Sequence, residues 1–104
     1  MRESKFQKTV MDDIERLLPG AIIIKVEPYI QGFPDLIIIY GKNWAALETK
    51  SSEKASRRPN QPYWIDILSD MSFAAFVYPK NKEEVLHELQ QTFTRDSTRI
   101  PVGE

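Results

Sequence analysis

Residues 35–50 read DLIIIYGKNWAALETK. The apolar run from Leu36 to Tyr40 is rich in β-branched side chains, which favours a well-buried strand. Gly41-Lys42-Asn43 has the composition of a turn, and the run from Trp44 to Lys50 has the length of another strand. The pattern predicts an antiparallel hairpin at the centre of the fold.

The turn also sets the register of this hairpin. If Gly41-Lys42 forms a two-residue loop, Tyr40 pairs with Asn43. Counting back along the ladder then places Asp35 directly opposite Glu48, and opposed residues of an antiparallel pair share a face. A three-residue turn or a bulge would break the count.

The hairpin ends in the charged sequence Glu48-Thr49-Lys50. Side chains alternate between the faces of a strand, so Glu48 and Lys50 point to one side while Thr49 points to the other. With Asp35 opposite Glu48, two carboxylates and an ammonium share one patch. Neighbouring carboxylates repel each other, and a bound divalent ion relieves that repulsion. Oxygen ligands without cysteine or a nearby histidine favour Mg²⁺, with Mn²⁺ as a substitute.

Helices are expected both before and after the hairpin in the sequence. We expect a helix over residues 3–18, followed by strands over 21–27, 36–40 and 44–50. A second helix should start at 59–62 with Asn60 as its cap. A strand over 73–78 and a helix over about 81–92 should follow. The first helix is predicted from apolar residues at steps of three and four, namely Phe6, Val10, Ile14, Leu17 and Leu18. The order predicts an α/β protein with a mixed sheet covered by helices.

The chain of 104 residues fits one domain, which we expect over residues 1–93, with a flexible tail over 94–104. Its content of 41% hydrophobic and 28% charged residues is typical of soluble globular proteins. The longest apolar runs are far shorter than the roughly 20 residues of a membrane span, and the N-terminal residues lack the apolar core of a signal peptide. We expect an intracellular, cytoplasmic protein with no membrane association, in a bacterial or phage-like setting.

Two of these segments carry a family resemblance. Gly32-Phe33-Pro34-Asp35 followed by Glu48-Thr49-Lys50 resembles the signature of PD-(D/E)xK nucleases. The order of motifs is similar to the VRR-Nuc branch, which has a glutamate on the first helix, a G-x-P-D segment, an E-x-K strand and a glutamine that opens the next helix. The residues at these positions are Glu3, Asp35, Glu48, Lys50 and Gln61. The resemblance covers roughly residues 3–78.

The resemblance implies a restriction-endonuclease-like core of order α-β-β-β-α-β(-α), with a central mixed four-stranded sheet flanked by helices. It also implies a Mg²⁺-dependent deoxyribonuclease that hydrolyses phosphodiester bonds. The implied metal ligands are Glu3, Asp35, Glu48 and the main-chain carbonyl of Thr49. Lys50 would orient water and stabilise developing charge, and Gln61 would help to position that water. Compact relatives resemble Holliday-junction resolvases, which implies a homodimer that acts as an endonuclease on branched or junction DNA.

Basic residues follow the charged strand in a polar loop. Flexible cations there would contact phosphates on either side of the scissile bond. The expected DNA contacts are Lys54, Arg57 and Arg58 in the loop, extended by Lys5 and Lys8 on the first helix.

Each feature also has a simpler interpretation. Glu48 and Lys50 form an ordinary ion pair in many strands, Gln61 suits a helix cap, and Arg57-Arg58 suits a solvated loop. The agreement of all features with one topology favours the nuclease. Two alternatives stay open, a nucleic-acid-binding or structural subunit that keeps the fold without cutting and an interaction protein unrelated to nucleic acid. His87 is assigned no role, and Trp44, Trp64, Phe73 and Phe76 are expected in the core or at an interface.

Overall fold

The computed structural model describes residues 2–27 and 29–99. The elements of this part of the chain are α1 (Glu3–Leu17), β1 (Ile22–Lys25), β2 (Leu36–Tyr40), β3 (Asn43–Thr49), α2 (Asn60–Met71), β4 (Phe73–Val77) and α3 (Lys82–Arg99). The expected α-β-β-β-α-β-α order is therefore confirmed.

The described strands form one mixed sheet in the order β1-β2-β3-β4. β2 is antiparallel to both β1 and β3, and β4 runs parallel to β3. Tyr40 pairs with Asn43, as the turn predicted, and the ladder ends at the pair Leu36 and Leu47. Gly41 lies in the turn with φ 63°, a conformation that glycine adopts at little cost.

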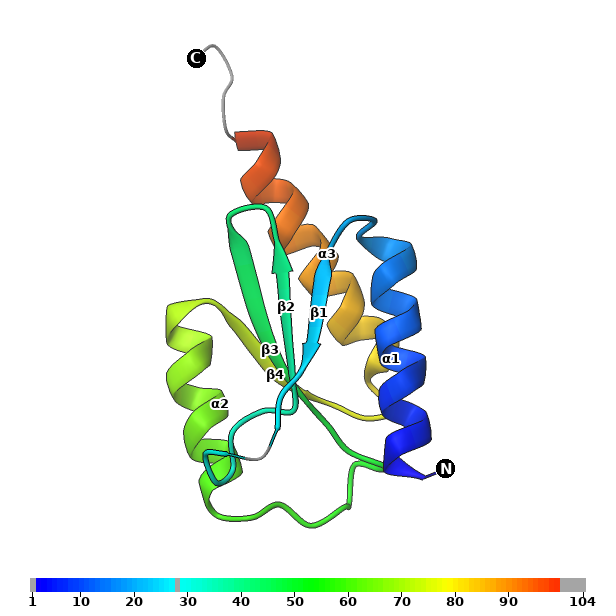
Figure 1. Ribbon diagram of the computed structural model, residues 1–104, viewed down its shortest axis with the longest axis vertical. Helices are drawn as coiled ribbons and strands as arrows, with labels where there is room; N and C mark the ends of the chain where they lie inside the picture. The colour runs from blue at the N-terminus through cyan, green and yellow to red at the C-terminus, as the bar shows by residue number, and fades with distance from the viewer. Residues whose placement is uncertain (1, 28, 100–104) are drawn as a thin grey trace.

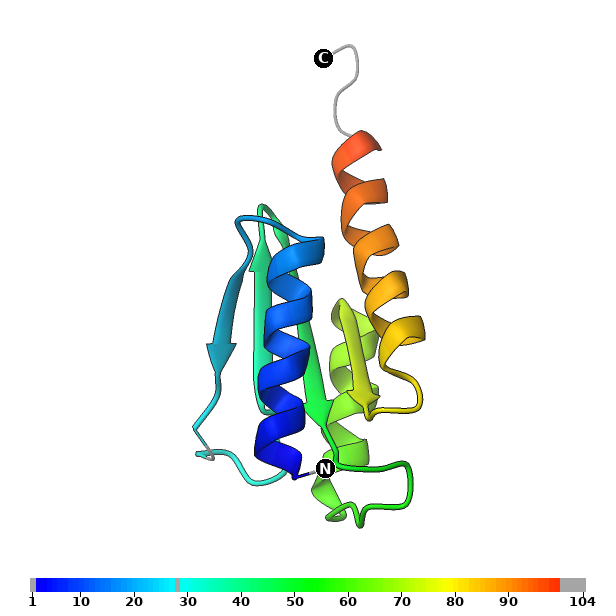
Figure 2. The same ribbon diagram turned by 90° about the vertical axis from the view of Figure 1, so that its right-hand side faces the viewer.

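Helices cover both faces of this sheet. Figure 2 looks onto the face that α1 and α3 cover, with α2 behind the sheet, and Figure 1 shows α1 and α2 on opposite sides of it. The core lies between the sheet and the pair α1 and α3. Its fully buried side chains include Phe6, Val10 and Ile14 from α1, Leu36, Ile38 and Leu47 from the hairpin, and Leu89 and Phe93 from α3.

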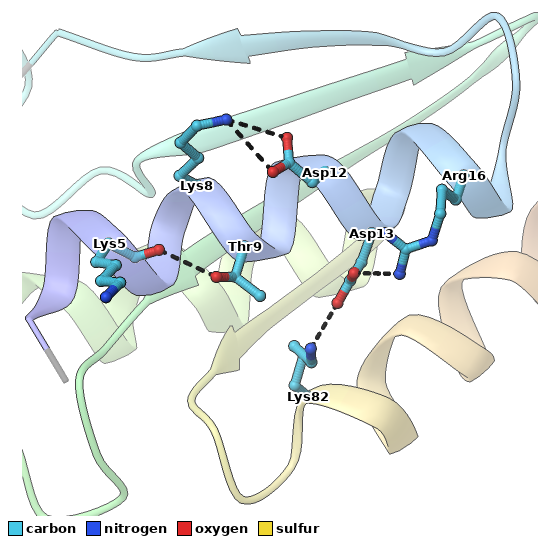
Figure 3. Close-up of polar contacts among 7 residues, drawn as sticks. All are labelled: Lys5, Lys8, Thr9, Asp12, Asp13, Arg16 and Lys82. Atoms are coloured by element: carbon cyan, nitrogen blue, oxygen red, sulfur yellow. Dashed lines mark hydrogen bonds and ion pairs between the residues drawn. The ribbon is translucent and has the colours of Figure 1, made fainter.

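A polar contact joins α1 to α3 beside this core (Figure 3). The Asp13 carboxylate accepts a hydrogen bond of 2.5 Å from Lys82 Nζ and a further short one from Arg16. Burial raises the pKa of Asp13, but hydrogen bonds and charges of Lys82 and Arg16 outweigh burial, and the pKa is lowered. Asp13 thus acts as a charged bridge between the two helices.

The C-terminal region departs from expectation. Instead of ending near residue 92, α3 continues to Arg99, so residues 94–99 of the expected tail are helical. The reason is that no proline or glycine interrupts residues 82–99, and buried Phe93 anchors the helix on the sheet. Residues 100–104 of the expected tail lie outside the described residues.

The first helix and strand differ in smaller ways. Leu17, expected on the buried stripe, is 36% exposed, while Leu18 is buried just after the helix ends. β1 forms only four residues of the expected 21–27 strand, and Pro28, where that strand was expected to stop, is outside the described residues. None of the helices in the described part of the chain is long and apolar enough to span a bilayer.

Candidate active site

A cavity of about 480 Å³ opens where β2 begins and β3 ends. The sequence-predicted residues that line it are Glu3, Asp35, Glu48, Lys50, Arg58 and Gln61. They come from the start of α1, the two strands of the hairpin, the loop after β3 and the start of α2. The fold therefore brings together residues that lie up to 58 positions apart, from Glu3 to Gln61.

Asp35 is held by main-chain and side-chain donors. Its Oδ1 accepts a hydrogen bond of 3.0 Å from the Thr49 N–H, and its Oδ2 accepts one from the Thr49 hydroxyl. Oδ2 also accepts a bond of 2.9 Å from Gln7 Nε2. These donors fix the carboxylate before any ligand arrives.

The contact with Thr49 corrects one expectation. Alternation along the strand predicted that the Thr49 side chain points away from the site, yet its hydroxyl bonds to Asp35. The β2–β3 ladder stops at Leu36 and Leu47, so no strand carbonyl is available to the Thr49 N–H. The Asp35 carboxylate takes that place, which draws it towards both polar groups of Thr49.

Glu48 is an acid in a confined position. It is 6% exposed, and its Oε2 accepts a bond of 3.0 Å from Gln61 Nε2. Burial, then the charge of Asp35 and that of Glu3 raise its pKa, while Lys50 lowers it, and the net pKa is about 7. The site therefore holds this acid against burial and nearby acidic charge, with Lys50 as the buried cation that opposes both.

Lys50 is that cation. It is 7% exposed, and its Nζ lies 3.7 Å from Glu48 Oε2. Nζ also donates a bond of 3.1 Å to the Ser56 carbonyl, and the Lys50 N–H donates to Val77 O at 2.9 Å. The bond to Ser56 ties the side chain to the loop after β3, and the bond to Val77 continues the pairing of β3 with β4.

Gln61 connects the start of α2 to the acids. Its Oε1 accepts a bond of 3.0 Å from the Arg58 N–H, while its Nε2 donates to Glu48. The residue before the helix is Pro59, and no side chain caps the helix, so the expected cap by Asn60 is wrong. The Arg58 N–H lies close to the helix start and takes the Gln61 oxygen as its acceptor. Gln61 therefore both orders the loop after β3 and orients Glu48.

Gln7 contacts the site but was not identified as a site residue from the sequence. It follows Glu3 by one turn of α1 and lies on the same face, so helical spacing was the available signal. Its contact with Asp35 spans 28 positions in the chain and depends on how α1 packs on the sheet.

The predicted DNA-contacting cations are distributed unevenly. Arg58 lines the cavity, whereas the Arg57 guanidinium lies 3.9 Å from the centre of the Phe76 ring, a cation–π contact. Lys54 lines a separate hollow beside Lys80. On α1, Lys8 pairs with Asp12 at 3.3 Å, and Lys5 is exposed (Figure 3).

The acids offer a limited set of metal ligands. Among residues 2–27 and 29–99, no three acidic or histidine side chains are grouped so that they could hold an ion together. Asp35 and Glu48 line one cavity, and Mg²⁺ commonly binds one or two carboxylates while it keeps several waters. The donor set suits Mg²⁺ better than an ion that needs a full protein cage.

A solved structure described as a VRR_NUC domain matches this chain with a TM-score of 0.66. The chain has the VRR_NUC fold. The match covers 82% of this chain and 94% of that chain at 20% sequence identity, so the likeness concerns the fold. Compared by sequence, the chain matches no family description and no curated protein. The expected α/β fold, with a mixed four-stranded sheet between helices, is confirmed.

Proposed function

We propose that this protein is a metal-dependent deoxyribonuclease that hydrolyses phosphodiester bonds. The observation that carries the proposal is the convergence of Asp35, Glu48 and Lys50 on one cavity at the end of the β2–β3 hairpin. Burying two opposite charges at a strand end costs free energy, and chemistry is a reason to retain them. The VRR_NUC fold supports the same proposal.

Mg²⁺ is the proposed ion, with Mn²⁺ as a substitute. Asp35, Glu48 and the Thr49 carbonyl would hold it, and the charge of Glu3, which lines the same cavity, would add to the attraction for a cation. When bound, a divalent ion polarises a phosphate oxygen and lowers the pKa of water. Burial and then the charge of Asp35 raise the pKa of Glu48, and a bound cation would favour the charged carboxylate against both effects, which supports this assignment.

The other residues would position the reacting groups. Lys50 would keep its ammonium directed into the cavity, where it stabilises negative charge on the attacked phosphate. Gln61 would hold Glu48 in place through its amide and orient the attacking water. Gln7 and Thr49 would keep Asp35 in one rotamer, so that little reorganisation is needed on binding.

DNA is the proposed partner, with branched or junction DNA as the preferred form and an intracellular site of action. Arg58 would contact a phosphate near the scissile bond, and Lys5, Lys8, Lys54 and Arg57 would follow the backbone outwards. A homodimer is proposed because a small domain covers little duplex alone. The exposed side chains of Ile22 and Ile24 on edge strand β1 offer an apolar surface for the second copy. Light scattering tests the dimer, and a monomer at all concentrations contradicts it.

Cleavage assays test the catalytic proposal directly. Plasmid and four-way-junction DNA are incubated with and without Mg²⁺, using wild type, Asp35→Ala and Lys50→Ala. Asp66→Ala serves as a matched control, because Asp66 is an exposed acid on α2 outside the cavity. We expect cutting by wild type and control only. No cutting by wild type in Mg²⁺ or Mn²⁺ contradicts the proposal, and equal cutting by all four proteins indicates a contaminant.

A non-catalytic DNA-binding subunit is the second candidate. It is favoured by the three hydrogen bonds that the Asp35 carboxylate accepts from Gln7 and Thr49. These bonds stabilise the carboxylate without an ion. This candidate predicts salt-dependent binding to DNA that Arg58→Ala weakens, together with intact substrate under all metal conditions.

A further inference from the structure

The connection between β1 and β2 carries an exposed apolar tip. Tyr29 is 94% exposed and Ile30 is 44% exposed. Both residues line the cavity that contains Asp35 and Glu48. An aromatic ring with its faces in water gains free energy when a flat ligand stacks on it. The tip therefore presents a stacking surface at the mouth of the candidate site.

The base of the same connection is anchored on α2. Gly32 has φ +83° and lies so close to Asn60 that a Cβ at this position would be 2.4 Å from the Asn60 Cβ. The Phe33 and Trp64 rings meet edge to face with centroids 5.3 Å apart, and the Phe33 N–H donates to Ile30 O at 3.1 Å. Figure 1 shows the connection beside the start of α2. The exposed tip thus projects from a fixed base.

The cavity combines three kinds of surface. Asp35 and Glu48 supply carboxylates, Arg58 and Lys50 supply cations, and Tyr29 supplies an aromatic ring. A nucleotide presents complementary groups, since its phosphate is an anion and its base is a flat π-system. Within a continuous duplex, neighbouring pairs cover both faces of each base. Only an unpaired base has a face free to stack on Tyr29.

We infer that Tyr29 is a stacking contact for an unpaired nucleobase next to the scissile phosphate, with Ile30 packing beside it. The inference rests on the proposed nuclease function, because it places DNA in the cavity. It makes Tyr29 a specificity-determining residue that favours DNA with unpaired nucleotides over continuous duplex. Arg58 would hold the phosphate attached to the stacked nucleotide.

Binding measurements without cleavage test this role. Fluorescence anisotropy compares a single-stranded oligonucleotide with a continuous duplex of the same sequence, with Ca²⁺ in place of Mg²⁺. We expect Tyr29→Ala to weaken single-strand binding roughly 5- to 100-fold and to leave duplex binding nearly unchanged. Tyr29→Trp should restore single-strand binding. Stacking should also quench 2-aminopurine in the single strand with wild type and not with Tyr29→Ala.

Tyr63 provides the matched control. It is 59% exposed on α2 and does not line the cavity, so Tyr63→Ala should bind both DNAs as wild type does. Equal single-strand affinity of Tyr29→Ala and wild type, or equal weakening for both DNAs, overturns the stacking role. Loss of dimers by Tyr29→Ala in light scattering, with single-strand affinity unchanged, would identify the tip as a contact between copies.

The outcomes separate this inference from the proposed function. If Tyr29→Ala binds like wild type while Asp35→Ala still abolishes cleavage, the stacking role fails and the nuclease stands. If wild type binds neither DNA and cuts none, both fail.

Discussion

The Asp35 carboxylate accepts hydrogen bonds from both the N–H and the hydroxyl of Thr49, at the point where the β2–β3 ladder ends. An acidic side chain thus replaces the strand carbonyl that the ladder would otherwise supply. The arrangement couples the orientation of one candidate metal ligand to the end of the central hairpin.

Thr49→Val removes the hydroxyl and keeps the N–H and the branched shape. We expect roughly 10-fold weaker Mg²⁺ binding or cleavage, because groups that orient a metal ligand typically contribute on this scale. Thr49→Ser, which keeps the hydroxyl, should stay close to wild type. Mg²⁺ titration of DNA cleavage measures the effect, and equal Mg²⁺ dependence of both variants contradicts it.

Gln7→Leu removes the amide that bonds to Asp35 Oδ2. We expect a loss of similar size in Mg²⁺ dependence, with little change in the midpoint of thermal unfolding, because Gln7 is only half-buried. Gln90→Leu is the control, since Gln90 donates to Leu17 O away from the cavity. A drop in thermal stability that accounts for the lost activity would show a merely structural role.

Glu48 makes the stability of the metal-free protein depend on pH. Its pKa rises from 4.5 in the unfolded chain to about 7 in the folded protein, so the folded state holds the proton more tightly. Its contribution to the free energy of unfolding is present below about pH 4.5 and is lost as the pH rises through about 7. The loss is on the order of 3 kcal/mol.

Urea unfolding of wild type and Glu48→Gln measures this difference. The variant keeps a neutral side chain, so its stability relative to wild type should increase between about pH 5 and pH 8. Mg²⁺ should reduce the difference at the higher pH by binding the folded wild type. A constant difference across the range would contradict the assignment.

Asp13→Asn tests the bridge between α1 and α3. The change removes a charged acceptor from Lys82 and Arg16, and we expect a loss of roughly 1–3 kcal/mol in the free energy of unfolding. Asp12→Asn, at an exposed pair with Lys8, should change it by less than about 1 kcal/mol. Equal effects of the two substitutions in urea unfolding would argue against the bridge.

Gly32→Ala tests the anchoring of the β1–β2 connection. Alanine at φ +83° is strained, and its Cβ would also meet Asn60 at 2.4 Å. Gly20→Ala is the matched control, because Gly20 has φ +93° with nothing within 4 Å of the added carbon. Both variants should lose roughly 1–2 kcal/mol from backbone strain, and Gly32→Ala should lose more. Thermal unfolding measures these losses. Equal losses of stability in the two variants would show that the close approach to Asn60 is unimportant.

The hairpin could be predicted from the sequence because its signals are local. A two-residue turn fixes the pairing of Tyr40 with Asn43, and a period of two then places Glu48 and Lys50 on one face. The convergence of Asp35 and Glu48 on one cavity follows from the same count.

The remaining site geometry depends on contacts beyond the ladder. The Thr49 hydroxyl and the Gln7 amide reach Asp35 because the strand pairing stops and α1 packs against the sheet there, and neither event has a local sequence signal. The length of α3 was underestimated because polar residues after Phe93 suggested a tail, although none of those up to Arg99 breaks a helix.

β3 is hydrogen-bonded along both edges, to β2 on one side and to β4 on the other. Residues 45–47 are paired on both sides, so their amides should exchange with deuterium only through openings that disrupt the whole sheet, whereas the last two residues of β3 pair with β4 alone. The two connections that border the cavity, residues 29–34 and 51–59 among those described, lie outside these ladders. Substrate preference could consequently diverge through changes in these connections, while the charges at residues 48 and 50 stay attached to the pairing of β3 with β4.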